Sequence, residues 1–331
     1  MSKTALVAIG GNSLIRAGEK GVIAEQLANA RRTAQAIVGL LRLGYRLVIT
    51  HGNGPQVGAQ LLRSERASDV VYRQTLDVCG AASQGEIGYL LEQSLQNEIV
   101  AAGLDIPVAS LVTRTVVSPD DPAMEHPSKP IGPFYSRFDA EEKKRLLGWH
   151  IVEDASRGYR RVVPSPEPLE IVELDVIREL VARGILVVSA GGGGIPVMRV
   201  EGQLQGVEAV IDKDRASALL ASQLGVDLFA ISTDADYVYL NYRRPGHTPL
   251  TSVTVSQLQE YQRAGHFPPG NMGPKIESVI YFLQKGGKEA VVTSFEYLCE
   301  AVAGRAGTRI VPDAGQLGET AATELEVPVL R

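Results

Sequence analysis

The sequence has few cysteines, no long uncharged apolar run and no excess of basic residues, and each shortage excludes a class of protein. Cys79 and Cys299 are its two cysteines and form no Cys-X-X-Cys pair, so we expect neither a thiolate zinc site nor a disulfide framework. The longest uncharged apolar stretch, residues 185–198, is interrupted by glycines and is shorter than the roughly 18 residues of a membrane-spanning helix. The first apolar run leads directly into glycines, unlike a signal peptide. We therefore expect a cytoplasmic protein with no membrane partner.

Basic residues are balanced by acidic ones, since 33 Lys and Arg stand against 38 Asp and Glu, a formal net charge of −5. A general nucleic-acid-binding protein normally carries a basic surplus, so we expect no nucleic-acid partner. A local basic cluster inside a cleft stays possible. Hydrophobic residues make up 44% of the 331 residues, which argues against a disordered chain and suits two domains or one large α/β unit.

The usual signatures of nucleotide and hydrolase chemistry are also missing. The sequence has no GxxxxGK[ST] loop, and no GxGxxG follows its first apolar run, so neither a P-loop nor a common dinucleotide-binding fold is expected. The HRD, DFG, HExxH and GxSxG motifs are absent as well, which argues against protein kinases, zinc proteases and serine hydrolases. Any phosphate chemistry must therefore use another scaffold.

Apolar runs alternate with helical patterns along the chain. The runs predict strands at residues 5–9, 47–50, 106–117, 185–189, 227–232 and 290–293. Apolar positions spaced by three and four residues predict a helix over residues 23–41. Further helices are predicted over residues 75–102, 171–183, 216–224 and 255–264, with others beginning at Pro55 and after residues 270–275. This βαβ order is typical of a parallel sheet with helices on both faces.

Residues 118–168 break this pattern. The segment contains eight of the 18 prolines, and proline is excluded from central strands and helix interiors. We expect a small lobe that stands off the main sheet, and a disordered linker is the alternative. The apolar residues that would form the minor core of this lobe are Leu146, Leu147, Trp149, Ile151 and Val152.

Glycines cluster directly after three predicted strands, at Gly10-Gly11, at Gly52-Asn53-Gly54 and at residues 191–194. The carboxyl ends of parallel strands meet at one edge of a sheet, where ligands bind. Glycine lets a ligand approach the backbone closely, and the amides that follow at helix N-termini bind anions. Three clusters at equivalent strand ends therefore predict an anion or phosphate site, with simple tight turns as the alternative.

Three lysines, Lys129, Lys213 and Lys275, lie where a turn or the start of a helix can deliver them. Taken alone, each is expected to be a solvated surface charge. The helix dipole disfavours a cation at a helix N-terminus, however, so a phosphate partner would explain Lys213 and Lys275. Phosphoryl transfer needs such positioned cations. Asp214 would hold two lysines in place or help to orient magnesium, and a helix N-cap is its alternative role.

A polar segment, Thr233-Asp234-Ala235-Asp236-Tyr237-Val238-Tyr239, follows another predicted strand. Its carboxylates suit the outer shell of a magnesium ion, which prefers oxygen ligands and keeps several waters. Its tyrosines could border a base or a ribose. A polar turn followed by an edge strand is the alternative interpretation.

Taken together, these motifs resemble the carbamate kinases, a branch of the amino-acid kinase superfamily, from residue 8 to Ile310. The matching stretches are Ala8–Asn12, His51–Gly58, Lys129–Tyr135, Ala190–Val197, Val210–Asp214, Thr233–Tyr239 and Gly273–Lys275. The resemblance implies a three-layer αβα sandwich with an open, mainly parallel sheet and a protruding subdomain at 118–168. It also implies a homodimer and a magnesium-dependent, reversible transfer between ATP and carbamate that gives ADP and carbamoyl phosphate, making ATP in arginine catabolism.

The resemblance also assigns parts of the chain. The kinase domain would cover residues 1–311, with a carbamate and phosphoryl part over about 1–170 and a nucleotide part over about 171–311. Family members tend to end near residues 307–310, so the tail at 312–331 has no assigned role. Related acyl-phosphate kinases carry a lysine at the position of Ala8. In the carbamate kinase branch, a lysine on the subdomain supplies that positive charge instead, and Lys129 matches it.

Site roles follow from the same resemblance, and no protein-held metal is expected. Lys129, Lys213 and Lys275 would stabilise the transferred phosphoryl group, and Asp214 would orient lysines. Backbone amides would bind carbamate and the phosphoryl group at Gly10, Gly11, Asn12, Gly52, Asn53 and Gly54. The residues that would border the nucleotide are Gly191, Gly192, Thr233, Asp234, Tyr239, Met272 and Gly273.

Two other functions stay open. The first is a kinase of the same superfamily that phosphorylates a different small carboxylate or a phosphonate, although Ala8 and Lys129 argue against it. The second is a ligand sensor without catalysis on the same fold. Loss of the lysine set would mark such a sensor, and here the set is intact.

Overall fold

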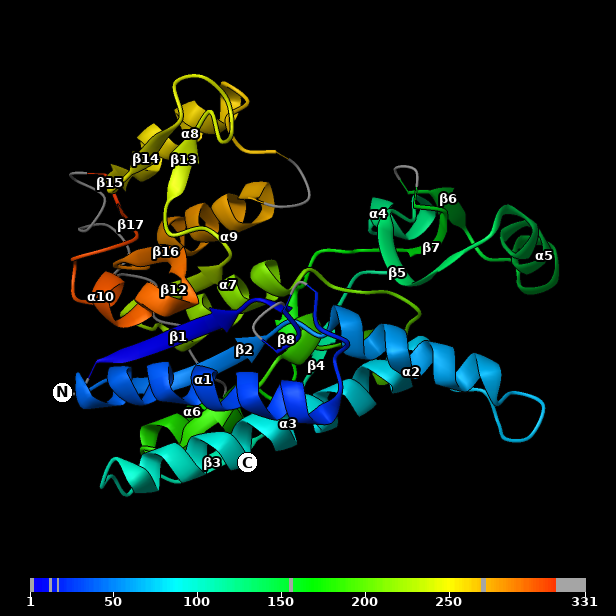
Figure 1. The fold of residues 1–331 in the computed structure, drawn as a ribbon, viewed down its shortest axis with the longest axis horizontal. Helices are drawn as coiled ribbons and strands as arrows, with labels where there is room; N and C mark the ends of the chain where they lie inside the picture. Colours follow the sequence, from blue (N-terminus) through cyan, green and yellow to red (C-terminus); the bar gives the residue numbers. More distant parts are fainter. Residues whose placement is uncertain (1–2, 12–13, 17, 155–156, 269–271, 314–331) are drawn as a thin grey trace.

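The computed structural model describes residues 3–11, 14–16, 18–154, 157–268 and 272–313. Its centre is an eight-stranded sheet covered by helices on both faces (Figure 1). In spatial order the strands are β15 (Ser252–Thr254), β17 (Thr308–Val311), β16 (Ala290–Ser294), β12 (Leu228–Thr233), β1 (Thr4–Ile9), β2 (Arg46–His51), β9 (Leu186–Val188) and β3 (Val108–Ser110). Every neighbouring pair is parallel except β16 with β17. The predicted three-layer sandwich with a mainly parallel sheet is therefore confirmed.

Strand β1 shows why helices cover both faces of the sheet. Its residues Ala5, Val7 and Ile9 belong to one apolar cluster, whereas Leu6 and Ala8 belong to another, and all five are fully buried. The first cluster includes side chains of α1 (Ile23–Arg42), α3 (Leu76–Ala101) and α10 (Leu298–Val302). The second includes side chains of α6 (Leu174–Ala182), α7 (Lys213–Leu224), α8 (Val255–Arg263) and α9 (Met272–Gln284). A strand buried on both faces reads as a continuous apolar run, as this one does.

The prediction of one strand over residues 106–117 is wrong. The chain forms β3 in the central sheet and then β4 (Arg114–Val116) in a second sheet, with β11 (Gln203–Gly206), β10 (Ile195–Val200) and β8 (Glu170–Ile171). The side chain of Gln84 separates the two strands, because it donates to the carbonyl of Thr113 at 3.1 Å and accepts from the N–H of Thr113 at 2.8 Å. A buried side-chain amide thus takes the place of a neighbouring strand. The other predicted strands and helices are present within a few residues.

The proline-rich segment folds into a lobe that stands off the main body (Figure 1). Strands β5 (Lys129–Tyr135), β7 (Tyr159–Val163) and β6 (Ile151–Glu153) form an antiparallel sheet, with helices α4 (Pro122–Glu125) and α5 (Arg137–Leu147) beside it. The predicted minor core is wrong for Leu146, Leu147 and Val152, which are exposed, and Trp149 is half-buried. Leu146 and Leu147 belong to α5, a polar helix that buries only Ala140. Val152 lies in β6, where Ile151 is the buried residue. The apolar side chains that the lobe does bury are Ile131, Ala140, Ile151, Val162 and Val163.

The central sheet is continuous across residue 170, because β9 lies between β2 and β3. The sheet does not divide at that point. That residues 1–170 bind carbamate and the phosphoryl group, and residues 171–311 the nucleotide, therefore stays a prediction. Of the predicted tail at 312–331, residues 314–331 lie outside the described residues. None of the described helices combines the length and the apolar character that crossing a membrane requires.

Candidate active site

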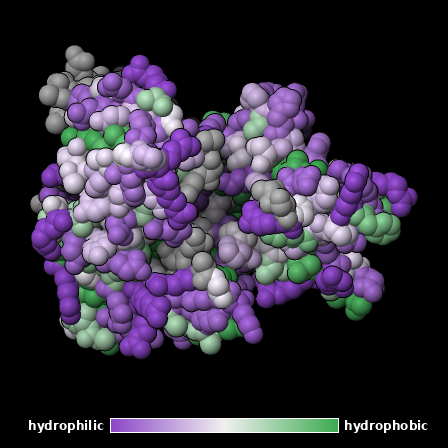
Figure 2. Space-filling model, turned by 45° about the horizontal axis from the view of Figure 1, so that its top comes forward, coloured by the Kyte–Doolittle hydropathy of each residue, from purple (hydrophilic) through white to green (hydrophobic). Residues whose placement is uncertain are grey.

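A cavity of about 320 Å³ opens where the turns after β1 and β2 meet the lobe and the first turns of α7 and α9. Figure 2 shows the surface hollowed between the main body and the lobe. The register pairs Ile9 with His51, so the carboxyl ends of β1 and β2 share this edge of the sheet. The predicted site residues that line the cavity are Gly11, Gly52, Asn53, Gly54, Lys129, Gly192, Lys213, Asp214 and Lys275.

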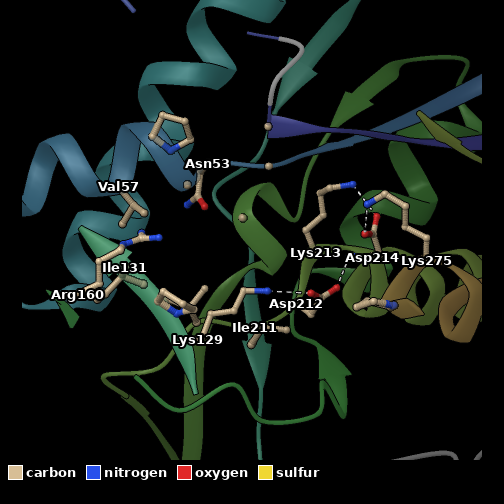
Figure 3. Close-up of a pocket in the computed structure, with 18 residues that line it drawn as sticks. Asn53, Val57, Lys129, Ile131, Arg160, Ile211, Asp212, Lys213, Asp214 and Lys275 are labelled. Atoms are coloured by element: carbon tan, nitrogen blue, oxygen red, sulfur yellow. Dashed lines mark hydrogen bonds and ion pairs between the residues drawn. The ribbon is translucent and has the colours of Figure 1, made fainter. Parts of the chain in front are cut away.

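Asp214 lies between two lysines on the floor of this cavity (Figure 3). Its Oδ1 accepts a hydrogen bond from Lys213 at 2.6 Å, and its Oδ2 accepts one from Lys275 at 2.9 Å. Burial alone would raise the pKa of Asp214, but the two ammonium groups outweigh it and hold that pKa below its ordinary value. Burial and the charge of Lys275 lower the pKa of Lys213, against the opposing pull of Asp214. Two cations sharing one carboxylate leave a net positive charge that attracts an anion.

The two lysines reach the cavity because each lies in the first turn of a helix. Helix α7 begins at Lys213, and the N-cap is Asp212, whose Oδ1 accepts from the N–H groups of Asp214 at 3.0 Å and Arg215 at 3.4 Å. The alternative role of Asp214 as N-cap is therefore wrong, since its side chain is occupied by the lysines. Helix α9 begins at Met272 and places Lys275 in its first turn.

The lobe contributes two cations to the cavity. Lys129 of β5 forms a 2.9 Å ion pair with Asp212, and this ammonium group outweighs burial and lowers the pKa of Asp212. Arg160 of β7 also lines the cavity, and the sequence analysis missed it. Its guanidinium carbon lies 5.2 Å from the centre of the Phe134 ring and its Nη1 is 3.5 Å from Asp154, while no described residue satisfies its buried Nε. Arg160 pairs with Val152 of β6 and faces the irregular part of β5 between Ile131 and Tyr135, and no sequence signal gives that arrangement.

The glycine clusters are explained by close approach of backbones and by left-handed conformations. A Cβ on Gly52 would lie 2.8 Å from the backbone nitrogen of Gly11, so the turns after β1 and β2 leave no room for a side chain there. In the 3₁₀ turn at Gly191–Gly193, Gly192 has φ of +67° and a Cβ on it would overlap the Asn53 side chain. Substitution at either position must displace the cavity wall.

Helix α3 supports this turn from behind with Gln84, another residue that the sequence analysis missed. Its Nε2 donates to the carbonyl of Gly191 at 2.9 Å. The neighbouring His51 is buried, and burial lowers its pKa to about 4, so the ring is neutral at pH 7. Its Nδ1 lies 3.1 Å from the carbonyl oxygen of Gly52. A carbonyl oxygen can only accept, so the neutral ring donates its single proton from Nδ1 to Gly52. His51 therefore has no free proton for the cavity, which fits a structural role.

The other described residues that were predicted to bind substrate or nucleotide do not line this cavity. Gly10 lies at the end of β1, where a Cβ would be 3.3 Å from the carbonyl of Ser232, and Asn12 lies outside the described residues. Thr233 ends β12. Tyr239 of β13 (Val238–Leu240) makes an edge-to-face contact with His247, which directly precedes β14 (Thr248–Leu250), and the two ring centres are 4.3 Å apart. Their roles stay predictions, as do those of Gly191, Asp234, Met272 and Gly273.

Comparison with known proteins agrees with this geometry. A profile of the amino acid kinase family matches residues 3–294. Carbamate kinase from Thermococcus kodakarensis is 46% identical over 312 residues, covering 93% of this chain and 99% of the relative. The enzyme from Staphylococcus haemolyticus is 46% identical over 313 residues, covering 94% and 99%. The structure of carbamate kinase from Giardia lamblia bound to AMP-PNP superposes with a TM-score of 0.90 at 41% identity and covers 94% and 99% of the two chains. The chain therefore belongs to the amino acid kinase family, in its carbamate kinase branch.

Proposed function

We propose that this enzyme transfers a phosphoryl group reversibly from ATP to carbamate. The products of the transfer are ADP and carbamoyl phosphate. The observation that carries the proposal is the convergence of Lys129, Lys213 and Lys275 on one cavity. A transferring phosphoryl group spreads negative charge over three oxygens, and fixed cations around it lower the barrier. Lysines from the lobe, from α7 and from α9 can surround such a group on three sides.

Asp214 acts by holding the cations rather than by touching the substrate. Because it is only 6% exposed and accepts from both lysines, the two ammonium groups are already in place before a substrate arrives. Cations that are fixed beforehand do not have to reorganise as charge moves from one oxygen to another. The N-terminus of α2 (Gly54–Arg66) lies beside them and offers backbone N–H groups, which favour anions.

Magnesium enters this proposal as part of the nucleotide substrate. Among the described residues, no group of three His, Cys, Asp or Glu side chains is arranged to hold a metal ion. The two carboxylates of the cavity, Asp212 and Asp214, are already paired with lysines. Magnesium bound mainly by phosphates and water is the common arrangement in kinases, and its charge would assist the lysines at the bridging oxygen.

The nucleotide is expected to extend beyond the cavity along the carboxyl ends of β1 and β12. The AMP-PNP complex of the Giardia enzyme supports a nucleotide site in this fold. Thr233, Asp234 and Tyr239 follow β12, and Gly273 lies in the first turn of α9 beside Lys275. We place the base and ribose against these residues and the phosphates against Gly191 and Gly192.

Resemblance to the carbamate kinases supports the remaining parts of the proposal. We infer that the enzyme works as a homodimer in the cytoplasm and makes ATP from carbamoyl phosphate during arginine catabolism. Sedimentation of the purified protein tests the dimer. Gene neighbours that encode an arginine deiminase or a carbamoyltransferase would support this direction.

The reaction is tested directly with the purified protein. ADP, magnesium and carbamoyl phosphate are mixed with the enzyme, and ATP is measured by chromatography of quenched samples. We expect ATP to form at a rate proportional to enzyme and to stop when magnesium is chelated. Preference for another acyl phosphate over carbamoyl phosphate would favour a different kinase of the family. Nucleotide binding without any transfer would favour a ligand sensor.

A further inference from the structure

The side chain of Asn53 has a defined orientation in the cavity wall. Its Nδ2 donates a hydrogen bond to the hydroxyl oxygen of Ser83 at 2.8 Å, and that hydroxyl is 2.7 Å from the carbonyl oxygen of Gly80. A carbonyl oxygen can only accept, so the Ser83 hydroxyl must give its single proton to Gly80. Ser83 is then left with lone pairs alone, and only the NH₂ end of Asn53 can face it. The hydrogen-bond chain therefore fixes which end of the amide is which.

The other end of this amide is the carbonyl oxygen Oδ1, and no described residue donates a hydrogen bond to it. Asn53 lines the cavity, and Figure 3 shows its amide directed toward the space between Arg160 and Lys213. The backbone of Gly192 packs against the amide so closely that a Cβ there would overlap it. Among the residues that the structure describes, Oδ1 is thus a hydrogen-bond acceptor that no donor occupies.

An acceptor is unusual among the groups that line this cavity. The described lining side chains comprise four cations, two carboxylates, several apolar groups and the one neutral amide of Asn53. The cations are donors only, and the carboxylates of Asp212 and Asp214 accept from lysines. Oδ1 is therefore the neutral acceptor among the described lining side chains, and it accepts a hydrogen bond without repelling an anion.

Carbamate differs from acetate in one group, a planar NH₂ that donates hydrogen bonds where acetate has a CH₃ that does not. We propose that Oδ1 of Asn53 accepts this N–H, and that Ser83 is a positioning residue that sets the choice of carbamate by fixing the Asn53 amide. The proposal rests on the proposed function. If the Ser83 hydroxyl is removed, the amide is free to turn its own NH₂ into the cavity, where two donors would face one another.

The test compares two ligands of the same shape, carbamoyl phosphate and acetyl phosphate, in which CH₃ replaces NH₂. The kcat/KM is measured for carbamoyl phosphate, and acetyl phosphate is titrated as a competitor, so that its inhibition constant is obtained whether or not it is turned over. For Ser83→Ala we expect kcat/KM for carbamoyl phosphate to fall about tenfold, as the loss of one hydrogen bond predicts. The inhibition constant of acetyl phosphate should stay within about twofold.

Two further variants make the result decisive. Ser94→Ala is the matched control, because Ser94 is also a buried serine of α3 but donates only to the carbonyl of Leu90, at 2.7 Å, and it should change neither constant. Asn53→Ala removes the acceptor itself and should lose the same preference, which covers the case in which Ser83→Ala folds poorly. Equal changes in both constants, or none, would overturn the role of Ser83 and Asn53. Failure of the wild type to use carbamoyl phosphate at all would instead overturn the proposed function and this inference with it.

Discussion

The Nζ of Lys129 lies 2.9 Å from Oδ2 of Asp212, although 83 residues separate them in the sequence. Asp212 also caps α7 through its other oxygen. One carboxylate therefore starts the helix that carries Lys213 and holds the lysine that the lobe delivers. The lobe is tied to the main body at the point where the chemistry is proposed to take place.

Removing this lysine should reduce catalysis more than stability. We expect Lys129→Ala to lower kcat about 100- to 1,000-fold, because one contact that stabilises the transition state is lost. The ion pair is partly exposed, so the melting temperature should change little. Lys144→Ala is the control, since Lys144 is a lobe lysine that pairs with Glu141 alone among the described acidic residues and is not part of the described cavity lining. An unchanged kcat in Lys129→Ala would show that the lobe lysine is not catalytic.

Arg160 should bind substrate, and the chain offers a close control for it. Both Arg157 and Arg160 pair with Asp154 and stack on Phe134, at 5.0 and 5.2 Å, but only Arg160 lines the described cavity. We expect Arg160→Gln to raise the KM for carbamoyl phosphate about tenfold, because a charge-assisted hydrogen bond is lost. Arg157→Gln should keep the wild-type KM. Equal KM values in the two variants would exclude Arg160 from the site.

Much of the fold follows from local patterns in the sequence. Strand β1 is an unbroken apolar run because helices cover both of its faces. Gly10 and Gly52 lie close to backbone atoms at the ends of strands, and Gly192 lies close to the Asn53 side chain. Lys213 and Lys275 indicated the site by their positions, because a cation at a helix N-terminus needs an anionic partner.

The features that the sequence could not predict depend on contacts between distant segments. The break between β3 and β4 requires the side chain of Gln84, which is 29 residues from Thr113. Arg160 pairs with Val152 of β6 and faces the irregular part of β5, and Ser83 meets Asn53 from 30 residues away. None of these contacts produces a periodic pattern in the sequence, because each depends on a single side chain that meets a distant segment.

His51 should make the free energy of unfolding depend on pH between about pH 4 and pH 6.5. Burial lowers its folded-state pKa to about 4, whereas an unfolded histidine has a pKa of about 6.5. The unfolded chain therefore takes up the proton first, so stability is full above about pH 6.5 and is lost as the pH falls toward 4. The loss should reach about 3 kcal/mol.

This dependence is measured as the free energy of unfolding in urea at several pH values between 4 and 8. His51→Gln should show a flatter curve than the wild type, whatever its stability at pH 8. His126→Gln, which changes an exposed histidine of the lobe, should keep the wild-type slope. Parallel curves for the wild type and His51→Gln would mean that His51 is not held neutral in the fold.

Alanine variants of two glycines with similar backbone conformations can distinguish backbone strain from displacement of a cavity side chain. Gly192 and Gly184 have φ of +67° and +80°, but a Cβ on Gly192 would overlap Asn53, whereas a Cβ on Gly184 would meet nothing within 4 Å. Both alanine variants should lose about 1–2 kcal/mol of stability from the left-handed backbone. Gly192→Ala should lose more, and its kcat/KM should fall about a hundredfold because the Asn53 amide is pushed aside. Gly184→Ala should keep wild-type kinetics, and full activity in Gly192→Ala would show that the position of Asn53 does not matter for turnover.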